Sequence, residues 1–327
     1  MGQGCLIELK NKLLNEQTLN SKFLYFCGIG LKDNWFKYEG SAIPQITVDQ
    51  IKNNILPLPS AAEQQKIADF LDEKVEEIDS VIARTKETIE DYKKYKQAII
   101  TDAVTKGLNL NVEMKKSGVE WIGDVPKYWK IFRIKNIAKE VGDGLHSTPE
   151  YDGNGDVFFI NGNNIGDEYL NIKENTNKLN ETEREKYKLP LLNENTIMIA
   201  LNGATYGKTS FYNGEKVLLG KSAGYITLSE TCNKRYVRYF LQSYSAKYSM
   251  ALSLNGTTIQ NLSLNTLNNF YITFPDMEEQ QRIVEFLDIK CSEIDKLLAK
   301  KEELLVDLED YKKSFIYEYV TGKKEVE

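Results

Sequence analysis

PSAAEQQKIADFLD, at residues 59–72, returns as PDMEEQQRIVEFLD at residues 275–288. The wider match joins residues 40–105 to residues 256–321 without a gap, at a constant offset of 216 positions. A solenoid repeat has a period of roughly 20–50 residues, so this repeat is too long for one. It has the size of a domain with its connector. The chain is therefore predicted to contain one and a half copies of a two-part unit.

Both copies continue into a pattern typical of a long helix. Apolar residues recur mostly every three or four positions over residues 61–105, without an internal glycine or proline. Ser60 and Asp276 are the predicted N-caps, and Gly107 and Gly322 follow the helix ends. Each helix would be on the order of 65 Å long. The narrow apolar stripe favours a coiled-coil seam between them over two unrelated amphipathic helices.

The segment between the helices, residues 118–275, has a different pattern of apolar and turn-forming residues. Short β-rich runs are separated by turns rich in glycine and asparagine, and they lie at Val157–Ile160, Thr196–Leu201, Thr209–Tyr212 and Tyr225–Leu228. Helices are expected at residues 181–188 and 234–247. Residues 1–58 resemble only the C-terminal part of this segment, with residues 22–26 aligned to residues 238–242.

The sequence thus predicts an α+β protein with one mixed α/β globular domain and two long helices that pack as an antiparallel coiled coil. The expected divisions are a domain remnant at 1–59, a first helix at 60–107, a complete domain at 108–275 and a second helix at 276–327.

Composition and charge narrow the class of protein. Hydrophobic residues make up 41% of the 327 residues, and no apolar run approaches the roughly 20 residues of a membrane span. The four cysteines are far apart, which favours free thiols in a reducing cytoplasm. The net charge is −6, yet residues 201–275 carry seven basic and two acidic side chains, a net +5. A local basic face of this kind suits contact with phosphates.

Residues 203–209, GATYGKT, imitate a phosphate-binding loop. That loop needs four residues between its glycines and a helix after it, whereas here three intervene and a strand-like run follows. We therefore expect a polar β-turn with Lys208 exposed, although nucleotide binding remains an alternative.

Polar residues in the loops of 118–275 form the candidate site. His146, the only histidine, is interpreted either as a DNA hydrogen-bonding residue or as an ordinary loop residue. Asparagine and glutamine pair with adenine, and lysine with guanine, although asparagine also simply forms turns. No metal or catalytic site is expected. The candidate DNA-binding residues are His146, Ser147, Thr148, Asn161, Asn163, Asn164, Asn202, Thr205, Tyr206, Lys208, Lys221, Thr257, Thr258 and Gln260.

The order and duplication of these motifs resemble the DNA-specificity (S) subunit of type I restriction-modification systems. Residues 117–129 look like the start of a target-recognition domain in that family. Residues 142–151, 159–165 and 202–208 look like its recognition loops. Residues 279–288 and 319–323 look like its conserved-helix signature. The resemblance covers essentially the whole chain.

This resemblance implies a subunit without catalysis or a cofactor of its own. Each recognition domain reads one half of a bipartite DNA target, and the long helices fix the spacing between the halves. The helices also dock two methyltransferase (M) subunits, which bind S-adenosylmethionine and methylate adenine, and a motor-nuclease (R) subunit that uses ATP joins the complex. The expected location is the cytoplasm.

The chain departs from the family pattern at its front. A full member has a whole recognition domain before residue 42, whereas here about 58 residues of it are expected. The chain would then read one half-site, with a second copy or a separate chain supplying the other domain. Two alternatives remain: a scaffold, decoy or recombination-cassette remnant that binds M subunits without reading DNA, and an ATP-using enzyme built on residues 203–209.

Overall fold

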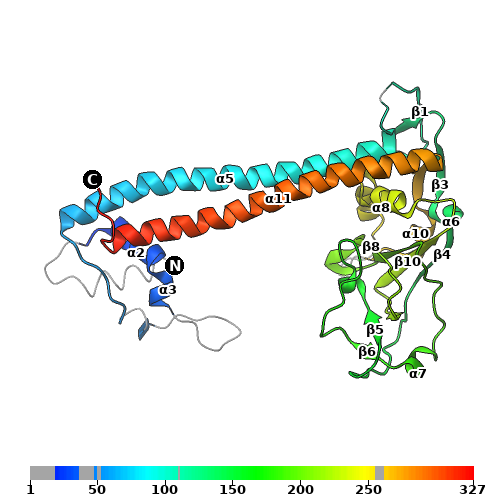
Figure 1. The fold of residues 1–327 in the computed structure, drawn as a ribbon, viewed down its shortest axis with the longest axis horizontal. Coiled ribbons are helices and arrows are strands. Elements are labelled where there is room, and N and C mark those ends of the chain that lie inside the picture. Colours follow the sequence, from blue (N-terminus) through cyan, green and yellow to red (C-terminus); the bar gives the residue numbers. More distant parts are fainter. Residues whose placement is uncertain (1–18, 37–47, 50–52, 110, 255–260) are drawn as a thin grey trace. The chain divides into compact units, whose positions relative to one another are not determined.

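The computed structural model describes residues 19–36, 48–49, 53–109, 111–254 and 261–327. The chain divides into two compact units, Met1–Tyr92 with Asp295–Glu327, and Lys93–Ile294. We call them unit 1 and unit 2. Two long helices, α5 (Ala61–Lys106) and α11 (Met277–Val320), each contribute to both units (Figure 1).

The long helices begin and end close to where the sequence predicts. The Glu63 backbone N–H donates to Ser60 Oγ at 3.3 Å, and the Glu279 backbone N–H donates to Asp276 Oδ1 at 2.8 Å. Both predicted N-caps are therefore confirmed. Gly107 and Gly322 follow the helix ends with φ values of 77° and 70°, the left-handed conformation that glycine adopts without strain.

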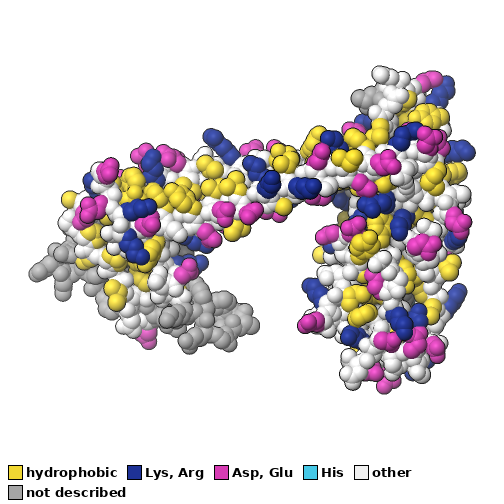
Figure 2. All heavy atoms as spheres, in the orientation of Figure 1, with side chains coloured by type: hydrophobic (Ala, Val, Ile, Leu, Met, Phe, Trp, Pro, Cys, Tyr) yellow, Lys and Arg dark blue, Asp and Glu magenta, His cyan; other side chains and the backbone are white. Residues whose placement is uncertain are grey.

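The two helices pair in opposite directions. In unit 1, Ile67 and Leu71 near the start of α5 share an apolar core with Ile316 near the end of α11. In unit 2, the order is reversed, because Val104 near the end of α5 packs with Leu287 near the start of α11. The antiparallel pairing predicted from the sequence is confirmed. Figure 2 shows acidic and basic side chains interspersed along these helices.

Unit 1 adds two short helices, α2 (Ser21–Gly30) and α3 (Lys32–Trp35). Phe23 and Phe26 of α2 are buried against residues of both long helices. A Cβ atom on Gly30 would lie only 3.1 Å from the backbone of Tyr317, so the absence of a side chain allows this close approach.

Unit 2 contains the sheets. The largest has the strand order β4-β10-β7-β8 and is antiparallel throughout. Its strands are β4 (Ala138–Asp143), β7 (Thr196–Ala200), β8 (Thr209–Phe211) and β10 (Ala223–Leu228). A second sheet places β5 (Val157–Ile160) between an antiparallel β6 (Lys178–Leu179) and a parallel β9 (Val217–Leu219). The predicted β-rich runs are all strands, so this part of the prediction is confirmed.

Two further strand pairs and several short helices complete unit 2. The pairs join β1 (Met114–Lys116) to β2 (Asp124–Pro126) and β3 (Lys130–Arg133) to β11 (Tyr271–Phe274). The helices are α6 (Ile134–Ile137), α7 (Glu181–Arg184), α10 (Leu264–Asn269) and the 3-10 turns η1 (Gly162–Asn164) and η2 (Gly203–Thr205).

The helix predicted over residues 234–247 is instead two helices, α8 (Lys234–Gln242) and α9 (Tyr244–Leu252). Ser243 between them is extended, and its Oγ accepts a hydrogen bond from the Ala246 N–H. A serine in this role starts a new helix rather than continuing the old one. The helix expected at 181–188 is also shorter, because α7 ends at Arg184.

The described part of the chain has no helix long and apolar enough to cross a membrane. Over the same residues, no group of three or more His, Cys, Asp and Glu side chains is placed to hold a metal ion.

Candidate DNA interface

Each long helix starts in the same hydrogen-bonded junction. The Gln64 side chain donates to the Pro59 carbonyl at 2.9 Å and accepts from the Asn20 N–H at 2.9 Å. Gln280 does the same with the Pro275 carbonyl and the Asn233 N–H, both at 3.0 Å. Both glutamines are buried, at 1% and 0% exposure. The repeated glutamine therefore ties a short helix, α2 or α8, to the start of a long one.

This junction corrects the predicted alignment of residues 22–26 with residues 238–242. Asn20 lies 44 positions before Gln64, whereas Asn233 lies 47 positions before Gln280. The flanking ion pair agrees, since Lys22 contacts Asp72 and Arg235 contacts Asp288. Lys22 thus corresponds to Arg235. The gapless alignment is wrong here because the connection in the second copy is three residues longer.

The junction of unit 2 has one addition that anchors the mixed domain. Glu279 accepts hydrogen bonds from Trp129 Nε1 at 2.8 Å and from the Tyr128 hydroxyl at 3.0 Å. Trp129 is fully buried, and Glu279 is only 8% exposed. Partial burial, together with the bond to Glu279, raises the pKa of Tyr128. The first part of the mixed domain is thereby fixed on the start of α11.

The loop that carries His146 leaves β4 and runs beside residues 220–221. Leu145 forms a parallel bridge with Gly220, and the Lys221 N–H donates to the Leu145 carbonyl at 2.9 Å. His146 is exposed, with Nε2 2.8 Å from Asp143 Oδ2. Ser147 and Thr148 are also exposed. The structure thus places His146 and Lys221 on neighbouring backbone segments.

The loop at residues 161–164 is hydrogen-bonded to Ser222, which directly follows Lys221. The Gly162 N–H donates to Ser222 Oγ at 2.9 Å, and Ser222 Oγ donates to Asn161 Oδ1 at 3.0 Å. Asn164 Oδ1 accepts from the Asn161 N–H at 2.9 Å. Two of the predicted readers, Asn161 and Asn164, therefore hold the loop together with their side-chain oxygens. Asn163, in the same loop, is exposed.

Residues 202–208 complete the cluster. Thr205 Oγ1 donates to the Gly162 carbonyl at 3.4 Å, and Lys208 Nζ lies 3.0 Å from Asp167 Oδ1. The chain turns through η2 and enters β8, with Gly203 and Gly207 at φ values of 73° and 76°. No helix follows the Gly-Lys-Thr motif, so the predicted polar loop is confirmed and it lacks the geometry of a phosphate-binding loop. Lys208, predicted to be exposed, is half-buried and pairs with Asp167.

The last three candidates, Thr257, Thr258 and Gln260, lie outside the described residues. Asn261, the first described residue after them, forms an antiparallel bridge with Asn202. Tyr206 is half-buried in the same loop. We call the surface formed by residues 145–148, 161–164, 202–208 and 220–222 the reading rim.

Acidic residues that the sequence analysis did not select also line this rim. A hollow of about 340 Å³ lies between Asp143, His146, Glu140 and Tyr225. The Tyr225 hydroxyl donates to Glu140 Oε1 at 2.7 Å, and burial raises the pKa of Tyr225 well above its usual range. Asp143 and Asp167 sit against His146 and Lys208. Among these acidic residues, only Asp143 could have been selected from the sequence, because it lies three positions before His146.

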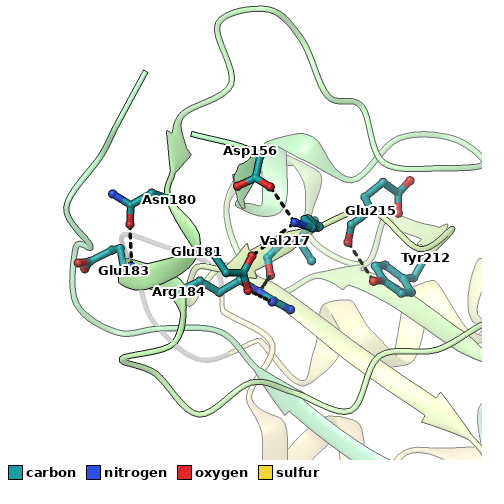
Figure 3. A network of polar contacts seen from close by, with 9 residues as sticks. Asp156, Asn180, Glu181, Glu183, Arg184, Tyr212, Glu215 and Val217 are labelled. Carbon is teal, nitrogen blue, oxygen red and sulfur yellow. Dashed lines mark hydrogen bonds and ion pairs between the residues drawn. The ribbon is translucent and has the colours of Figure 1, made fainter. Parts of the chain in front are cut away.

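A polar network behind the rim supports β9, which leads into residues 220–222 (Figure 3). Arg184 Nε donates to the Val217 carbonyl at 3.3 Å, and Arg184 Nη1 pairs with Glu181 at 2.5 Å. Lys216 pairs with Asp156 at 2.7 Å, which lowers the pKa of Asp156. The network therefore holds the start of β9, the strand that leads into residues 220–222 of the rim.

A family model described as the type I restriction modification DNA specificity domain matches residues 3–91 and 126–305. The chain belongs to this family, and the resemblance inferred from the sequence motifs is confirmed. The matched ranges include both helix starts and most of the mixed domain.

Among individual proteins, the chain is 27% identical to the type I restriction enzyme MjaVIII specificity subunit of Methanocaldococcus jannaschii, over 97% of this chain and 72% of that protein. It spans between 49% and 65% of four further curated relatives.

Two solved structures share the fold. One belongs to work on complex assembly and conformational transition of the type I R-M system, with a TM-score of 0.68, 18% identity, and coverage of 92% of this chain and 70% of that one. The other is the HsdS subunit from Thermoanaerobacter tengcongensis, with a TM-score of 0.52, 18% identity, and coverage of 94% and 71%. The predicted fold class is confirmed.

Proposed function

We propose that this chain is a non-catalytic specificity subunit that binds duplex DNA in a sequence-specific manner and reads one half of a bipartite target. The observation that carries the proposal is the reading rim. Four segments that are distant in sequence meet there, at Leu145, Gly162, Thr205 and Lys221, through hydrogen bonds between their backbones and side chains. Base edges in a major groove are read by side chains presented in this way from a fixed support.

We propose one half-site because the described residues form one such rim. The domain at 108–275 supplies one rim, whereas the described part of unit 1 supplies α2, α3 and the helix junction. The other half-site would be read by a domain from a second copy or from a separate chain.

The long helices are the proposed docking surface for methyltransferase subunits, through which the motor-nuclease subunit joins. Large apolar side chains of α11 remain exposed outside the helix seam, among them Ile289, Val306 and Tyr311. Exposed apolar residues along a helix are expected where a partner covers them. The relative named as a specificity subunit of a type I restriction enzyme supports a role for the chain as one subunit of such an enzyme.

A scaffold that binds methyltransferase subunits without reading DNA is the second candidate. One observation favours it: several candidate readers already have partners within the chain. Asn161 and Asn164 hold their own loop, and Lys208 and His146 face carboxylates. Such a subunit would retain the two long helices but would not recognise a DNA sequence.

Binding to duplex DNA tests the proposal. The chain assembled with its methyltransferase should bind DNA, and Lys208→Ala or Lys221→Ala should weaken binding and reduce its salt dependence by about one phosphate contact each. Replacing a true base reader, with Asn163→Ala as the first choice, should cost about 1–3 kcal/mol at one base position only.

The scaffold makes the opposite prediction. Sequencing of methylated adenines with and without the gene would then show no lost motif, and assembly with the methyltransferase would persist. A chain that binds no duplex DNA in any assembly would refute the reading function.

A further inference from the structure

The segment that leads into each long helix is a paired strand in unit 2 but has no strand partner in unit 1. Residues 55–58 correspond to β11, Tyr271–Phe274, at the constant offset of 216 positions. β11 pairs antiparallel with β3 along its whole length. Residues 55–58 form no strand pairing with any described residue. Unit 1 therefore presents an open strand edge, a feature to which extended segments of other chains add.

The alternation of an antiparallel ladder decides which backbone groups of β11 face β3. The Ile134 N–H, directly after β3, donates to the Phe270 carbonyl, directly before β11, at 2.9 Å. Hydrogen-bonded pairs recur at every second residue of such a ladder. Ile272 and Phe274 are therefore the residues that bond to β3. Thr273 between them faces away, and its carbonyl accepts a hydrogen bond from a tyrosine of α8 at 3.2 Å.

The counterparts in unit 1 follow the same alternation. Leu56 and Leu58 stand at the two positions that bond to β3 in unit 2, and neither N–H donates to a described residue. Pro57 stands at the position that faces away, where a strand needs no N–H for the ladder. The Ile55 carbonyl also faces away and accepts from Trp35 Nε1 at 3.0 Å. The proline therefore leaves both donors of the open edge in place.

The side chains of this edge are covered in unit 2 and exposed in unit 1. The Phe132 ring of β3 packs edge-on against the Phe274 ring, with the centroids 5.2 Å apart. The counterpart of Phe274 is Leu58, which is 39% exposed, and Ile55 at the other end of the segment is 86% exposed. Cross-strand contacts of this kind stabilise a sheet, so an added strand would cover the two exposed side chains.

The start of the long helix differs between the units in the same sense. In unit 2, Glu279 accepts from Trp129 Nε1 at 2.8 Å, and Trp129 directly precedes β3. A Cβ atom on Gly107, after the end of α5, would lie only 3.2 Å from the Trp129 ring. In unit 1, Glu63 is exposed, and its carboxylate accepts from no described residue. A Cβ atom on Gly322, after the end of α11, would have no described atom beyond its chain neighbours within 4 Å. The features that receive Trp129 therefore have open counterparts in unit 1.

We propose that residues 55–58 and Glu63 receive the first segment of a recognition domain carried by a separate chain. That segment adds to the open edge as an antiparallel strand and donates a tryptophan N–H to Glu63. It has the chemistry of residues 128–133, a Tyr-Trp pair followed by a strand with an aromatic side chain. The described copy of that segment is already held on Glu279, so the occupant belongs to another molecule. The inference rests on the proposed function, since the docked domain would read the second half-site.

The probe is a peptide with the sequence of residues 124–134, DVPKYWKIFRI, added at about 1 mM to the full chain. Hydrogen exchange should slow at the amides of Leu56 and Leu58, because both would enter a ladder, and should stay unchanged in β11. A peptide with alanine in place of the tryptophan should bind about tenfold more weakly, since a buried aromatic anchor contributes much of the affinity of such a contact. A scrambled peptide should give no protection.

Substitutions in the chain test the carboxylate. Glu63→Ala should weaken binding of the peptide about tenfold, because a hydrogen bond to a charged acceptor is lost. Glu76→Ala, at another exposed glutamate of α5, is the matched control and should leave the affinity unchanged. Both side chains are exposed, so thermal unfolding of the two variants should match the parent.

The outcomes separate this inference from the proposed function. Unchanged exchange at Leu56 and Leu58, equal binding of the tryptophan-free peptide, or an unchanged affinity of Glu63→Ala would overturn the docking site. Altered exchange confined to β11 would show that the peptide enters unit 2 instead, with the same consequence. Duplex binding by the chain assembled with its methyltransferase is measured alongside, since Glu63 lies outside the reading rim. Absence of duplex binding refutes the proposed function, whereas duplex binding without peptide binding refutes only this inference.

Discussion

The two helix junctions have the same hydrogen bonds around a buried glutamine, but only the junction in unit 2 adds a buried glutamate as an acceptor. In both, a buried glutamine joins a proline carbonyl to an asparagine N–H, as Gln64 does in unit 1 and Gln280 in unit 2. In unit 2, the preceding glutamate, Glu279, is buried beneath Trp129 and Tyr128. Its counterpart Glu63 is exposed. The glutamine thus stabilises the helix start, and the glutamate attaches the mixed domain to it.

The largest expected effect comes from the buried glutamines. Gln280→Leu removes a donor and an acceptor and leaves the Pro275 carbonyl and the Asn233 N–H buried without a partner. Each such group costs about 1–3 kcal/mol, so we expect unit 2 to lose about 3 kcal/mol in its free energy of unfolding. Gln64→Leu should destabilise unit 1 by a similar amount. Urea denaturation followed by hydrogen exchange of each unit measures both, and unequal losses would break the equivalence of the junctions.

The next effect should separate the junctions. Glu279→Gln replaces a charged acceptor and so weakens two hydrogen bonds. Because a hydrogen bond to a charged group contributes about 1.5–3 kcal/mol, we expect the free energy of unfolding of unit 2 alone to fall by about 2 kcal/mol. Glu63→Gln is the matched control at an exposed position and should change stability by less than about 0.5 kcal/mol. Hydrogen exchange of the backbone amides of each unit measures the difference. Equal effects of the two substitutions would show that Glu279 has no special anchoring role.

Acid should destabilise the mixed domain through protonation of Glu183. Hydrogen bonds from Lys186, Tyr187 and the Glu150 N–H lower the pKa of Glu183 to about 2. Because this pKa lies below the ordinary value of 4.5, the stability that Glu183 contributes is fully present above that pH and is lost as the pH falls toward about 2. Glu183→Gln should flatten the pH dependence of thermal unfolding across this window. A parallel acid profile for parent and variant would contradict the assignment.

The smallest effect is expected along the helix seam of unit 1. Lys312 pairs with Asp79 at 2.6 Å and Lys86 with Glu309 at 3.2 Å; the second pair is exposed to water, and in the first the lysine is half-buried while the aspartate is exposed. Exposed ion pairs contribute about 0–1 kcal/mol because water screens the charges. Lys312→Ala should therefore change the free energy of unfolding by no more than about 1 kcal/mol. A larger loss would mean that the seam depends on charge rather than on Leu71 and Ile316.

The sequence predicts which loops form the candidate site, but not what each side chain in them contacts. The loops at 142–151, 159–165 and 202–208 were expected to carry the polar readers, and the structure brings them together at the reading rim. Their individual roles could not be anticipated. Asn161 and Asn164 serve their own loop because Ser222 and the local backbone lie within hydrogen-bonding distance, and that proximity depends on strands far apart in the chain.

The sequence by itself determined the long helices, their caps and the repeat, because these depend on local spacing and on residues a few positions apart. Only the tertiary structure decided that Ser243 divides α8 from α9, that Lys22 corresponds to Arg235, and that Trp129 seats on Glu279. Those features depend on which distant groups meet in the folded chain, where a buried polar atom must find a partner. The spacing of apolar residues along the sequence does not indicate which distant residues come into contact.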